Sequence, residues 1–355
     1  MGCLVQRYQK ELEKLIPEVD VWIAYQTYDT LWEQIEAKIG QNEKSLCFMD
    51  RVITTGENYT YLRIAEGCSN RCTYCAIPSI RGPFQSRTIE DILEEANALV
   101  KKGYRELIVI AQDTTKYGID IYGEPKLVEL LQKLEKIENL KWIRFLYAYP
   151  ETITEDLIQT VKNSNKICHY FDIPIQHIAD PVLKRMNRKS NGDSIRKLIQ
   201  KLRKEIPDVI IRTTVMVGFP GETKENFEEL YQFVQEAKFD KLGAFSYSKE
   251  ENTPAARLKE QIHPMTKKSR YHKIMQLQQR VAKQNLENKI GNTYEVFIEN
   301  KTFDGKYYVG RSYMDVPDVD GFIYMPMIEK ALENQFVMCK ITGVQGYDLI
   351  GEIIE

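Results

Sequence analysis

The chain of 355 residues is long enough for two or three domains, and its content of 43% hydrophobic and 28% charged residues is typical of a soluble globular protein. It has no apolar run of about 18 residues and no apolar core near Met1, so we expect neither a membrane span nor export. The net charge of −2 gives no general attraction to nucleic acid.

Residues 1–55 contain too few apolar positions to build a core of their own. The pattern predicts helices over residues 6–15 and 30–39, and a short strand over residues 19–24. Gly40 would end the second helix. We therefore expect a remnant of an α/β domain whose first part lies upstream of Met1.

Residues 56–290 alternate between strands and amphipathic helices. Thr88 followed three residues later by Asp91 is a helix-start signal, and the apolar run at residues 107–110 is typical of a strand covered on both faces. Six strands with helices between them predict a partial parallel (βα) barrel. The expected strands are residues 59–65, 107–110, 142–147, 170–175, 209–217 and 241–247, and the expected later helices are residues 126–137, 154–162, 193–205 and 225–237.

The carboxyl ends of the six expected strands carry polar or glycine-rich segments. In parallel barrels the active site lies at this end of the strands. Any one of these segments could be an ordinary turn, but six on one rim indicate a site. They are the cysteine-rich loop and residues 112–114, 147–150, 174–177, 218–222 and 246–248.

A long polar helix over residues 267–289 closes this domain, and the remaining residues 291–355 have a different pattern. Short apolar stretches of alternating residues are separated there by Gly, Asp and Asn. This pattern predicts a small antiparallel β-barrel.

Three of the seven cysteines lie close together, at Cys68, Cys72 and Cys75. Such thiolates bind a soft metal or form disulfides, and an odd number of cysteines fits a reducing cytoplasm. A zinc site needs a fourth ligand, which only a remote residue could supply here. Three thiolates without a fourth suit a 4Fe-4S cluster with one iron open to a small ligand. The cluster and the zinc site both remain possible on the spacing alone.

The string CSNRCTYC, with an aromatic residue before its last cysteine, resembles the signature of radical S-adenosylmethionine (SAM) enzymes. Longer strings, among them AQDTTKYGIDIYG, RTTVMVGFPGET and GRSYMDVPDVDG, resemble the radical-SAM methylthiotransferases that modify an aspartate of ribosomal protein S-twelve. The resemblance covers nearly the whole chain. It implies a methylthiotransferase domain (residues 1–55 here), a radical-SAM domain (56–290) and an OB-like TRAM barrel (291–355).

The resemblance also implies two 4Fe-4S clusters in the full-length family. Cys68, Cys72 and Cys75 match the ligands of the cluster that binds SAM. Cys3 matches the third ligand of a second cluster, which carries the sulfur to be inserted, and the first two ligands should lie upstream of Met1. Cys47 matches no motif, so we expect it to be a free buried thiol, like Cys168 and Cys339.

The mechanism that the resemblance implies begins with reductive cleavage of SAM to a 5′-deoxyadenosyl radical, which removes a hydrogen from the aspartate β-carbon. Sulfur is inserted there, and a second SAM supplies the methyl group. The electron would come from a donor such as flavodoxin or ferredoxin, and we expect a cytoplasmic monomer. The candidate contacts of SAM are Tyr74, Gln112, Asp113, Arg212 and Gly218, while His177 either faces the substrate or is a structural histidine.

The related tRNA adenosine methylthiotransferases are the alternative within this chemistry. A truncated form that cleaves SAM without inserting sulfur, and a non-catalytic iron–sulfur or zinc protein, are further alternatives. Residues 291–355 carry five Lys and Arg against eleven Asp and Glu, a net charge of 5 − 11 = −6, which favours a basic protein substrate over RNA. We therefore expect Asp315, Asp318 and Asp320 to contact the ribosomal protein.

Overall fold

The computed structural model describes residues 2–19, 22–24, 33, 51–56, 58–328 and 332–354. Within residues 1–55 it contains helix α1 (Cys3–Leu15), which begins three residues before the predicted helix. Of the strand predicted over residues 19–24, the described part shows one bridge, between Gly2 and Ala24. The helix predicted over residues 30–39, apart from position 33, and Cys47 lie outside the described residues.

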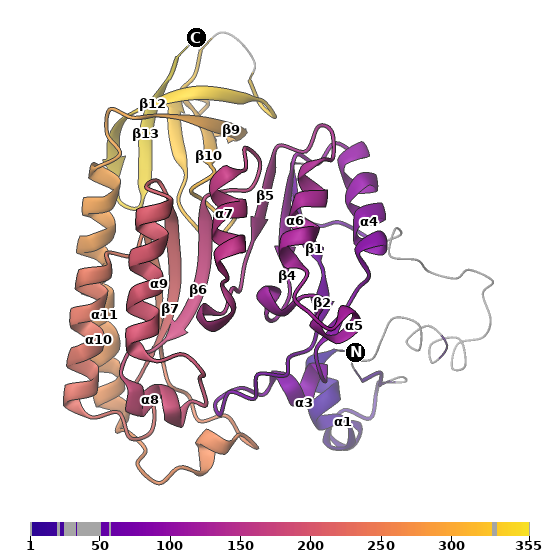
Figure 1. Ribbon diagram of the computed structural model, residues 1–355, viewed down its shortest axis with the longest axis vertical. Coiled ribbons are helices and arrows are strands. Elements are labelled where there is room, and N and C mark those ends of the chain that lie inside the picture. The colour runs from indigo at the N-terminus through magenta and orange to yellow at the C-terminus, as the bar shows by residue number, and fades with distance from the viewer. Residues whose placement is uncertain are drawn as a thin grey trace.

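The predicted partial barrel is confirmed. In the described part of the chain it consists of two parallel sheets of three strands each, together with a small antiparallel pair (Figure 1). The first sheet has the order β1 (Tyr59–Arg63), β4 (Glu106–Ile110) and β5 (Trp142–Phe145). The second has the order β6 (Tyr170–Gln176), β7 (Ile210–Val217) and β8 (Lys241–Ser246). The antiparallel pair is β2 (Ala65–Glu66) with β3 (Gln85–Ser86).

Amphipathic helices cover the outer faces of both sheets (Figure 1). Their starts are encoded locally: the Thr88 hydroxyl accepts a hydrogen bond from Asp91 N at 3.3 Å, and Asn191 and Ser194 form a capping box. Each fully buried Leu or Ile on their inner faces contributes about 1.5–3 kcal/mol. The long helices are α4 (Ile89–Lys101), α6 (Leu127–Glu135), α7 (Glu155–Asn163), α9 (Gly192–Glu205), α10 (Lys224–Ala237) and α11 (Pro264–Glu287).

Short helices occupy the loops that follow the strands. At the end of the barrel opposite the carboxyl terminus, α1 packs against the short helix α3, and α8 lies at the same end (Figure 1). The short α-helices are α3 (Ile77–Arg81), α5 (Ile119–Tyr122) and α8 (Asp180–Arg185), and the 3-10 helices are η2 (Thr114–Lys116), η3 (Pro150–Thr152) and η4 (Pro254–Arg257).

The carboxyl-terminal segment forms the predicted small barrel, which is closed in the order β10-β11-β13-β12-β9. Its pairs are antiparallel except β11 with β13, which run parallel because five strands closed in a ring cannot alternate direction at every pair. The strands are β9 (Thr293–Lys301), β10 (Tyr307–Ser312), β11 (Ile323–Pro326), β12 (Phe336–Gln345) and β13 (Asp348–Ile354).

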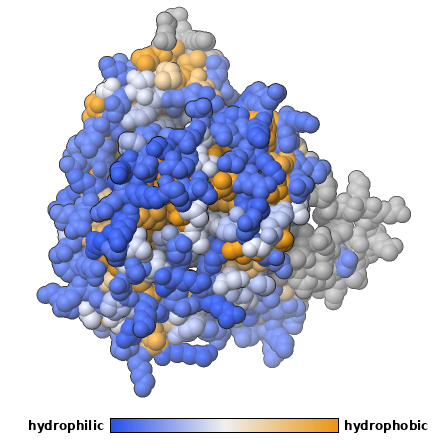
Figure 2. Space-filling view, in the orientation of Figure 1, coloured by the Kyte–Doolittle hydropathy of each residue, from blue (hydrophilic) through white to orange (hydrophobic). Residues whose placement is uncertain are grey.

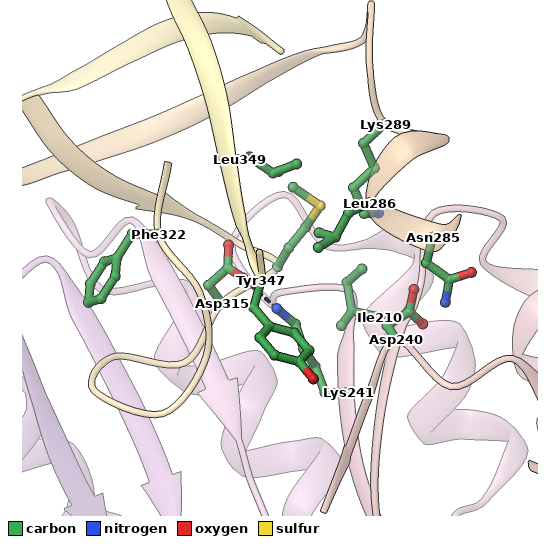
Figure 3. Close-up of a pocket in the computed structure, with 11 residues that line it drawn as sticks. Ile210, Asp240, Lys241, Asn285, Leu286, Lys289, Asp315, Phe322, Tyr347 and Leu349 are labelled. Atoms are coloured by element: carbon green, nitrogen blue, oxygen red, sulfur yellow. Dashed lines mark hydrogen bonds and ion pairs between the residues drawn. The ribbon is translucent and has the colours of Figure 1, made fainter. Parts of the chain in front are cut away.

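The small barrel packs against the amino-terminal ends of the parallel strands (Figure 1). Tyr59, Trp142 and Tyr170, which lie at the starts of their strands, share one apolar cluster with residues of the small barrel. At the edge of this junction, Lys241 Nζ lies 2.8 Å from Asp315 Oδ1 (Figure 3). The two ends of the parallel barrel therefore differ: one is closed by the small barrel, and the other carries the cysteines.

The face shown in Figure 2 is mostly hydrophilic, with hydrophobic side chains in separate spots rather than one continuous band. Among the described helices, none combines the length and the apolar character that crossing a membrane requires.

Candidate functional site

The three clustered cysteines lie on the loop that follows β2, at the carboxyl ends of the parallel strands; we call residues 68–75 the cysteine loop. Cys68 and Cys72 are each 6% exposed, Cys75 is half-buried, and all three thiols are free. Burial raises the pKa of Cys68 and of Cys75, although Ile77 N lies 3.5 Å from Cys75 Sγ and partly offsets the effect there. Thiols held together in this way can bind a soft metal once they are deprotonated.

The cysteine loop is held by backbone contacts from distant parts of the chain. Thr73 N donates to Met186 O at 3.0 Å, and Thr73 Oγ1 donates to Arg185 O at 2.8 Å. On the other side Gly67 has a φ of 79°, and any side chain there would collide with the Pro83 carbonyl. These contacts fix the loop before any ligand binds.

Asp113 positions the cysteine loop from the end of β4. Its carboxylate is fully buried, and it accepts hydrogen bonds from Asn70 Nδ2 at 2.8 Å and from Thr115 Oγ1 at 2.6 Å. Lys116 donates to the Asn70 side chain and lies 3.8 Å from Asp113. Burial raises the pKa of Asp113 in spite of these partners. Because both carboxylate oxygens already have partners, Asp113 acts through Asn70.

Two polar side chains beside the loop carry atoms without hydrogen-bond partners within the described residues. One of them, Arg188, was not predicted from the sequence; its Nη2 donates to the Pro174 carbonyl at 3.0 Å and lies 3.8 Å from Glu151 Oε2. Arg188 is 7% exposed, and its Nε and Nη1 have no hydrogen-bond partner in the described part of the chain. Its guanidinium lies over the Tyr149 ring at 4.3 Å, and its charge acts on Cys72. Gln112, next to Asp113, has an equally unpartnered Oε1 among the described residues. Buried polar atoms without a partner call for an explanation, and a ligand bound beside the cysteine loop would supply one for these.

Arg188 follows a short helix, so no periodicity marked it as a functional residue. Its position on a loop after the end of a strand is the only feature of the sequence that could have indicated a functional role. Many other residues share that position, so it does not single out Arg188.

Tyr74 packs edge-on against Phe219 with ring centroids 6.4 Å apart. The loop that carries Phe219 begins at Gly218, where φ is 71° and a side chain would collide with Lys267. Gly218 N donates to Glu222 Oε2 at 2.5 Å, so Glu222 fixes this loop. The predicted residue Tyr74, within the cysteine loop, therefore packs against the loop that begins at the predicted residue Gly218.

His177 is fully buried, and the hypothesis that it faces the substrate is wrong. Its Nδ1 accepts a hydrogen bond from Ala179 N at 3.0 Å, and its Nε2 lies 3.9 Å from Glu222 Oε2. Burial and the charge of Arg270 lower the pKa of His177 to about 3. It is a neutral structural histidine under the Gly218 loop.

Arg212 lies deeper in the barrel, away from the cysteine loop. Its Nε is 3.9 Å from Asp172 Oδ1, and Asp172 Oδ2 accepts a hydrogen bond from Tyr147 N at 3.0 Å. Tyr147 has a φ of 61°, which is strained for a tyrosine and common at functional sites. The side chains of Tyr147 and of Phe245 on β8 are 47% and 60% exposed, so large aromatic groups at two strand ends are open to a partner.

The acidic segment of the small barrel does not form the expected docking surface. Asp315 is 5% exposed and paired with Lys241, Asp320 accepts a hydrogen bond from the Tyr170 hydroxyl at 2.7 Å, and Asp318 accepts one from the Tyr59 hydroxyl. Of the three carboxylates, Asp318 is exposed, whereas Asp320 is half-buried. These carboxylates bind the small barrel to the parallel barrel, at the end opposite the cysteine loop.

The other cysteines differ in exposure. Cys168 and Cys339 are buried free thiols, as expected, whereas Cys3 is exposed at the start of α1. Arg7 and Tyr8 of α1 bind Glu250 and Glu251 in the loop after β8, so α1 lies on the rim that carries the cysteine loop.

The cysteine loop fits a cluster better than a single ion. In the described residues, no three His, Cys, Asp or Glu side chains are gathered closely enough to hold one metal ion. A zinc ion requires every sulfur to lie about 2.3 Å from one centre, whereas cysteines of an iron–sulfur cluster bind different irons. Three free thiols with unpartnered polar groups beside them suit a 4Fe-4S cluster with a second ligand on its open iron.

Comparison with known proteins defines the class. Residues 62–234 match the radical SAM superfamily, and residues 290–354 match the TRAM domain. The chain is thus a radical-SAM protein with a carboxyl-terminal TRAM barrel.

Two curated relatives identify the family more narrowly. The chain is 61% identical over 356 residues to the ribosomal protein uS12 methylthiotransferase RimO of Alkaliphilus oremlandii, covering 99% of this chain and 81% of the relative. It is 47% identical over 363 residues to the RimO of Clostridium tetani, covering 100% of this chain and 81% of that protein. The chain belongs to the RimO family of methylthiotransferases.

Proposed function

We propose that this protein adds a methylthio group to the β-carbon of an aspartate in ribosomal protein uS12. The observation that carries the proposal is the cysteine loop, with three free thiols at the carboxyl ends of the barrel strands. Membership of the RimO family supports the choice of reaction and substrate.

Cys68, Cys72 and Cys75 would hold a 4Fe-4S cluster, and SAM would bind beside it. When bound, these groups supply the one-electron chemistry that cleaves SAM. The Arg188 guanidinium is suited to the carboxylate of SAM, and Gln112 Oε1 is suited to its amino group, because both have unpartnered polar atoms. Tyr74 and the Gly218 loop would border the same ligand.

The other residues of the rim orient and shield this site. Asn70, held by Asp113 and Lys116, keeps the cysteine loop in place. Phe219 and Tyr247 are buried beside Tyr74 and exclude water. The exposed rings of Tyr147 and Phe245 would receive the substrate loop, with Arg212 and Asp172 below them as polar contacts.

Several further features belong to the proposal. We assign residues 1–55, 56–290 and 291–355 to the three parts of the family. One cluster would be held by the cysteine loop, and Cys3 would be one ligand of the second cluster that full-length relatives carry. The electron donor would be a flavodoxin or a ferredoxin, and the enzyme would act as a monomer in the cytoplasm, where ribosomal proteins are made.

Hydrogen transfer tests the function without requiring sulfur insertion. Anaerobically reconstituted protein is mixed with SAM, dithionite and uS12 whose aspartates carry deuterium on the β-carbon. We expect deuterium in the 5′-deoxyadenosine, and none when the Cys72→Ala variant is used. Deuterium transfer from labelled tRNA, with none from uS12, would instead identify the tRNA adenosine methylthiotransferase.

A further inference from the structure

An aromatic ladder runs from the cysteine loop to the surface. Tyr74 lies between Cys72 and Cys75 in sequence, and its ring contacts Phe219, which contacts Tyr247 with centroids 5.2 Å apart. Phe219 is fully buried and Tyr247 is 3% exposed, so the ladder is packed without a gap in one small apolar cluster. A continuous path of packed rings is a favourable medium for electron transfer.

The outer end of the ladder lies in a basic recess, formed by residues 246–249 and parts of residues 264–272. Lys267 donates from Nζ to the Tyr247 carbonyl at 2.8 Å and lies 4.7 Å from the centre of its ring. Lys249, Lys268 and His272 also line the recess, and its lining contains no carboxylate. Lys249 and Lys268 are exposed and have no ion pair among the described residues.

The recess is positively charged, although the whole molecule carries a slightly negative net charge. Between Glu260 and Glu287 the chain has six Lys and Arg and no Asp or Glu, although the protein has a net charge of −2. Of these six residues, only Arg270 pairs with a buried carboxylate in the described part of the chain: its Nη1 lies 2.7 Å from Glu222 Oε1. A local positive field on a slightly negative protein directs acidic partners to one place.

We propose that the basic recess is the docking site of a small acidic electron-carrier protein. The inference rests on the proposed function, because it requires an electron acceptor on the cysteine loop. The donor loses one electron, the group held by the cysteine loop gains it, and no atom or proton moves between the proteins. Transient redox complexes use small polar interfaces below about 1,200 Å², which suits an open recess with exposed lysines.

The first test is binding, measured by calorimetry with the full chain before cluster reconstitution. Oxidised flavodoxin, an acidic FMN protein, is the probe. We expect binding that weakens as salt increases, and a loss of about tenfold or more in the Lys249→Glu/Lys268→Glu double variant. The matched control is Lys301→Glu/Lys340→Glu in the small barrel, which has the same net charge and should bind as the wild type does.

The second test is electron delivery to the reconstituted protein. In the Lys249→Glu/Lys268→Glu variant, reduction by flavodoxin should slow by a similar factor, while reduction by dithionite is unchanged. Equal losses in both double variants would overturn the inference, because net charge alone would then explain them. Tighter binding of RNA than of flavodoxin at the recess would overturn it as well. Failure to cleave SAM with dithionite would refute the proposed function, whatever the binding result.

Discussion

Arg311 Nη1 on β10 lies 2.5 Å from Glu106 Oε2 on β4, and neither side chain is more than 2% exposed. Arg311 Nε also donates to Glu299 Oε1 at 2.6 Å, and Arg144 Nε donates to Glu106 Oε1 at 2.9 Å. Two guanidinium groups and two carboxylates therefore balance each other inside the junction between the two barrels. Burying these charges is tolerable only while every partner is present.

The Arg311→Met substitution should destabilise the protein by about 3–5 kcal/mol, because it leaves Glu106 and Glu299 with too little positive charge in a buried site. The lost contact joins the two barrels, so thermal unfolding should begin at a lower temperature and proteolysis between the barrels should become faster. Lys197→Met is the control, since its pair with Asp193 is exposed on both sides. Similar melting curves for the two variants would show that the buried pair is not needed.

Single replacement of Cys68, Cys72 or Cys75 by Ala should abolish the iron–sulfur absorption of the reconstituted protein, because three thiolates leave no spare ligand. Cys168→Ala and Cys339→Ala should keep it, since both thiols are buried elsewhere. Iron analysis should find about four irons per chain in the wild type, as one cubane requires. Loss of absorption in Cys168→Ala would refute the three-ligand assignment.

Arg188→Gln should weaken SAM binding by about tenfold or more, because a charged hydrogen bond to a carboxylate contributes about 1.5–3 kcal/mol. Binding can be followed through the perturbation of the cluster spectrum by SAM. The cluster content of the variant should remain that of the wild type, since Arg188 supplies no ligand to the cluster. Arg185→Gln, whose side chain binds Glu260 outside the site, is the control. Unchanged SAM affinity in Arg188→Gln would remove Arg188 from the site.

Much of the fold could be predicted because its signals are local. Thr88 starts α4 as expected, and the apolar run at residues 107–110 lies within β4. The spacing of Cys68, Cys72 and Cys75 likewise predicts a metal or cluster site from eight consecutive residues. Each of these features depends on neighbours within a few residues.

The remaining features depend on contacts between residues far apart in sequence, which periodicity does not record. Arg311 meets Glu106 across two domains, and Arg188 reaches the cysteine loop from the end of a short helix. The acidic run around Asp315 looked like an exposed surface because composition does not tell which partner a carboxylate meets. Asp315 is buried because it forms an ion pair with Lys241, which lies far upstream in the sequence.

Asp315→Lys should therefore act on stability and leave substrate recognition at the far rim intact. It places a second positive charge against Lys241 in a buried position, and we expect a cost of about 3–5 kcal/mol. Asp318→Asn, at an exposed position, should cost much less because its amide oxygen can still accept from Tyr59. Thermal melting separates the two variants. Weaker binding of uS12 by a fully folded Asp315→Lys protein would restore the docking interpretation.

His177 should make the protein less stable in mild acid. Its pKa is about 3 when folded, against 6.5 as the ordinary value, so below about pH 6.5 the unfolded chain binds a proton that the native protein does not. Stability is thus lost as the pH falls, by about 1.4 kcal/mol per pH unit and by about 2 kcal/mol at about pH 5. Glu222 has the opposite effect, because burial raises the pKa of its carboxyl and the native state takes up that proton more readily.

The His177→Gln variant isolates the histidine, since Glu222 is present in both proteins and a glutamine side chain does not titrate. Between pH 7 and about pH 5, the stability of the wild type should therefore fall more steeply than that of His177→Gln. The control is His272→Gln, at an exposed position, which should follow the wild type. Denaturant unfolding at a series of pH values measures all three proteins. Parallel curves for wild type and His177→Gln would mean that His177 takes up its proton in the native state, and that it is not the neutral support of the Gly218 loop.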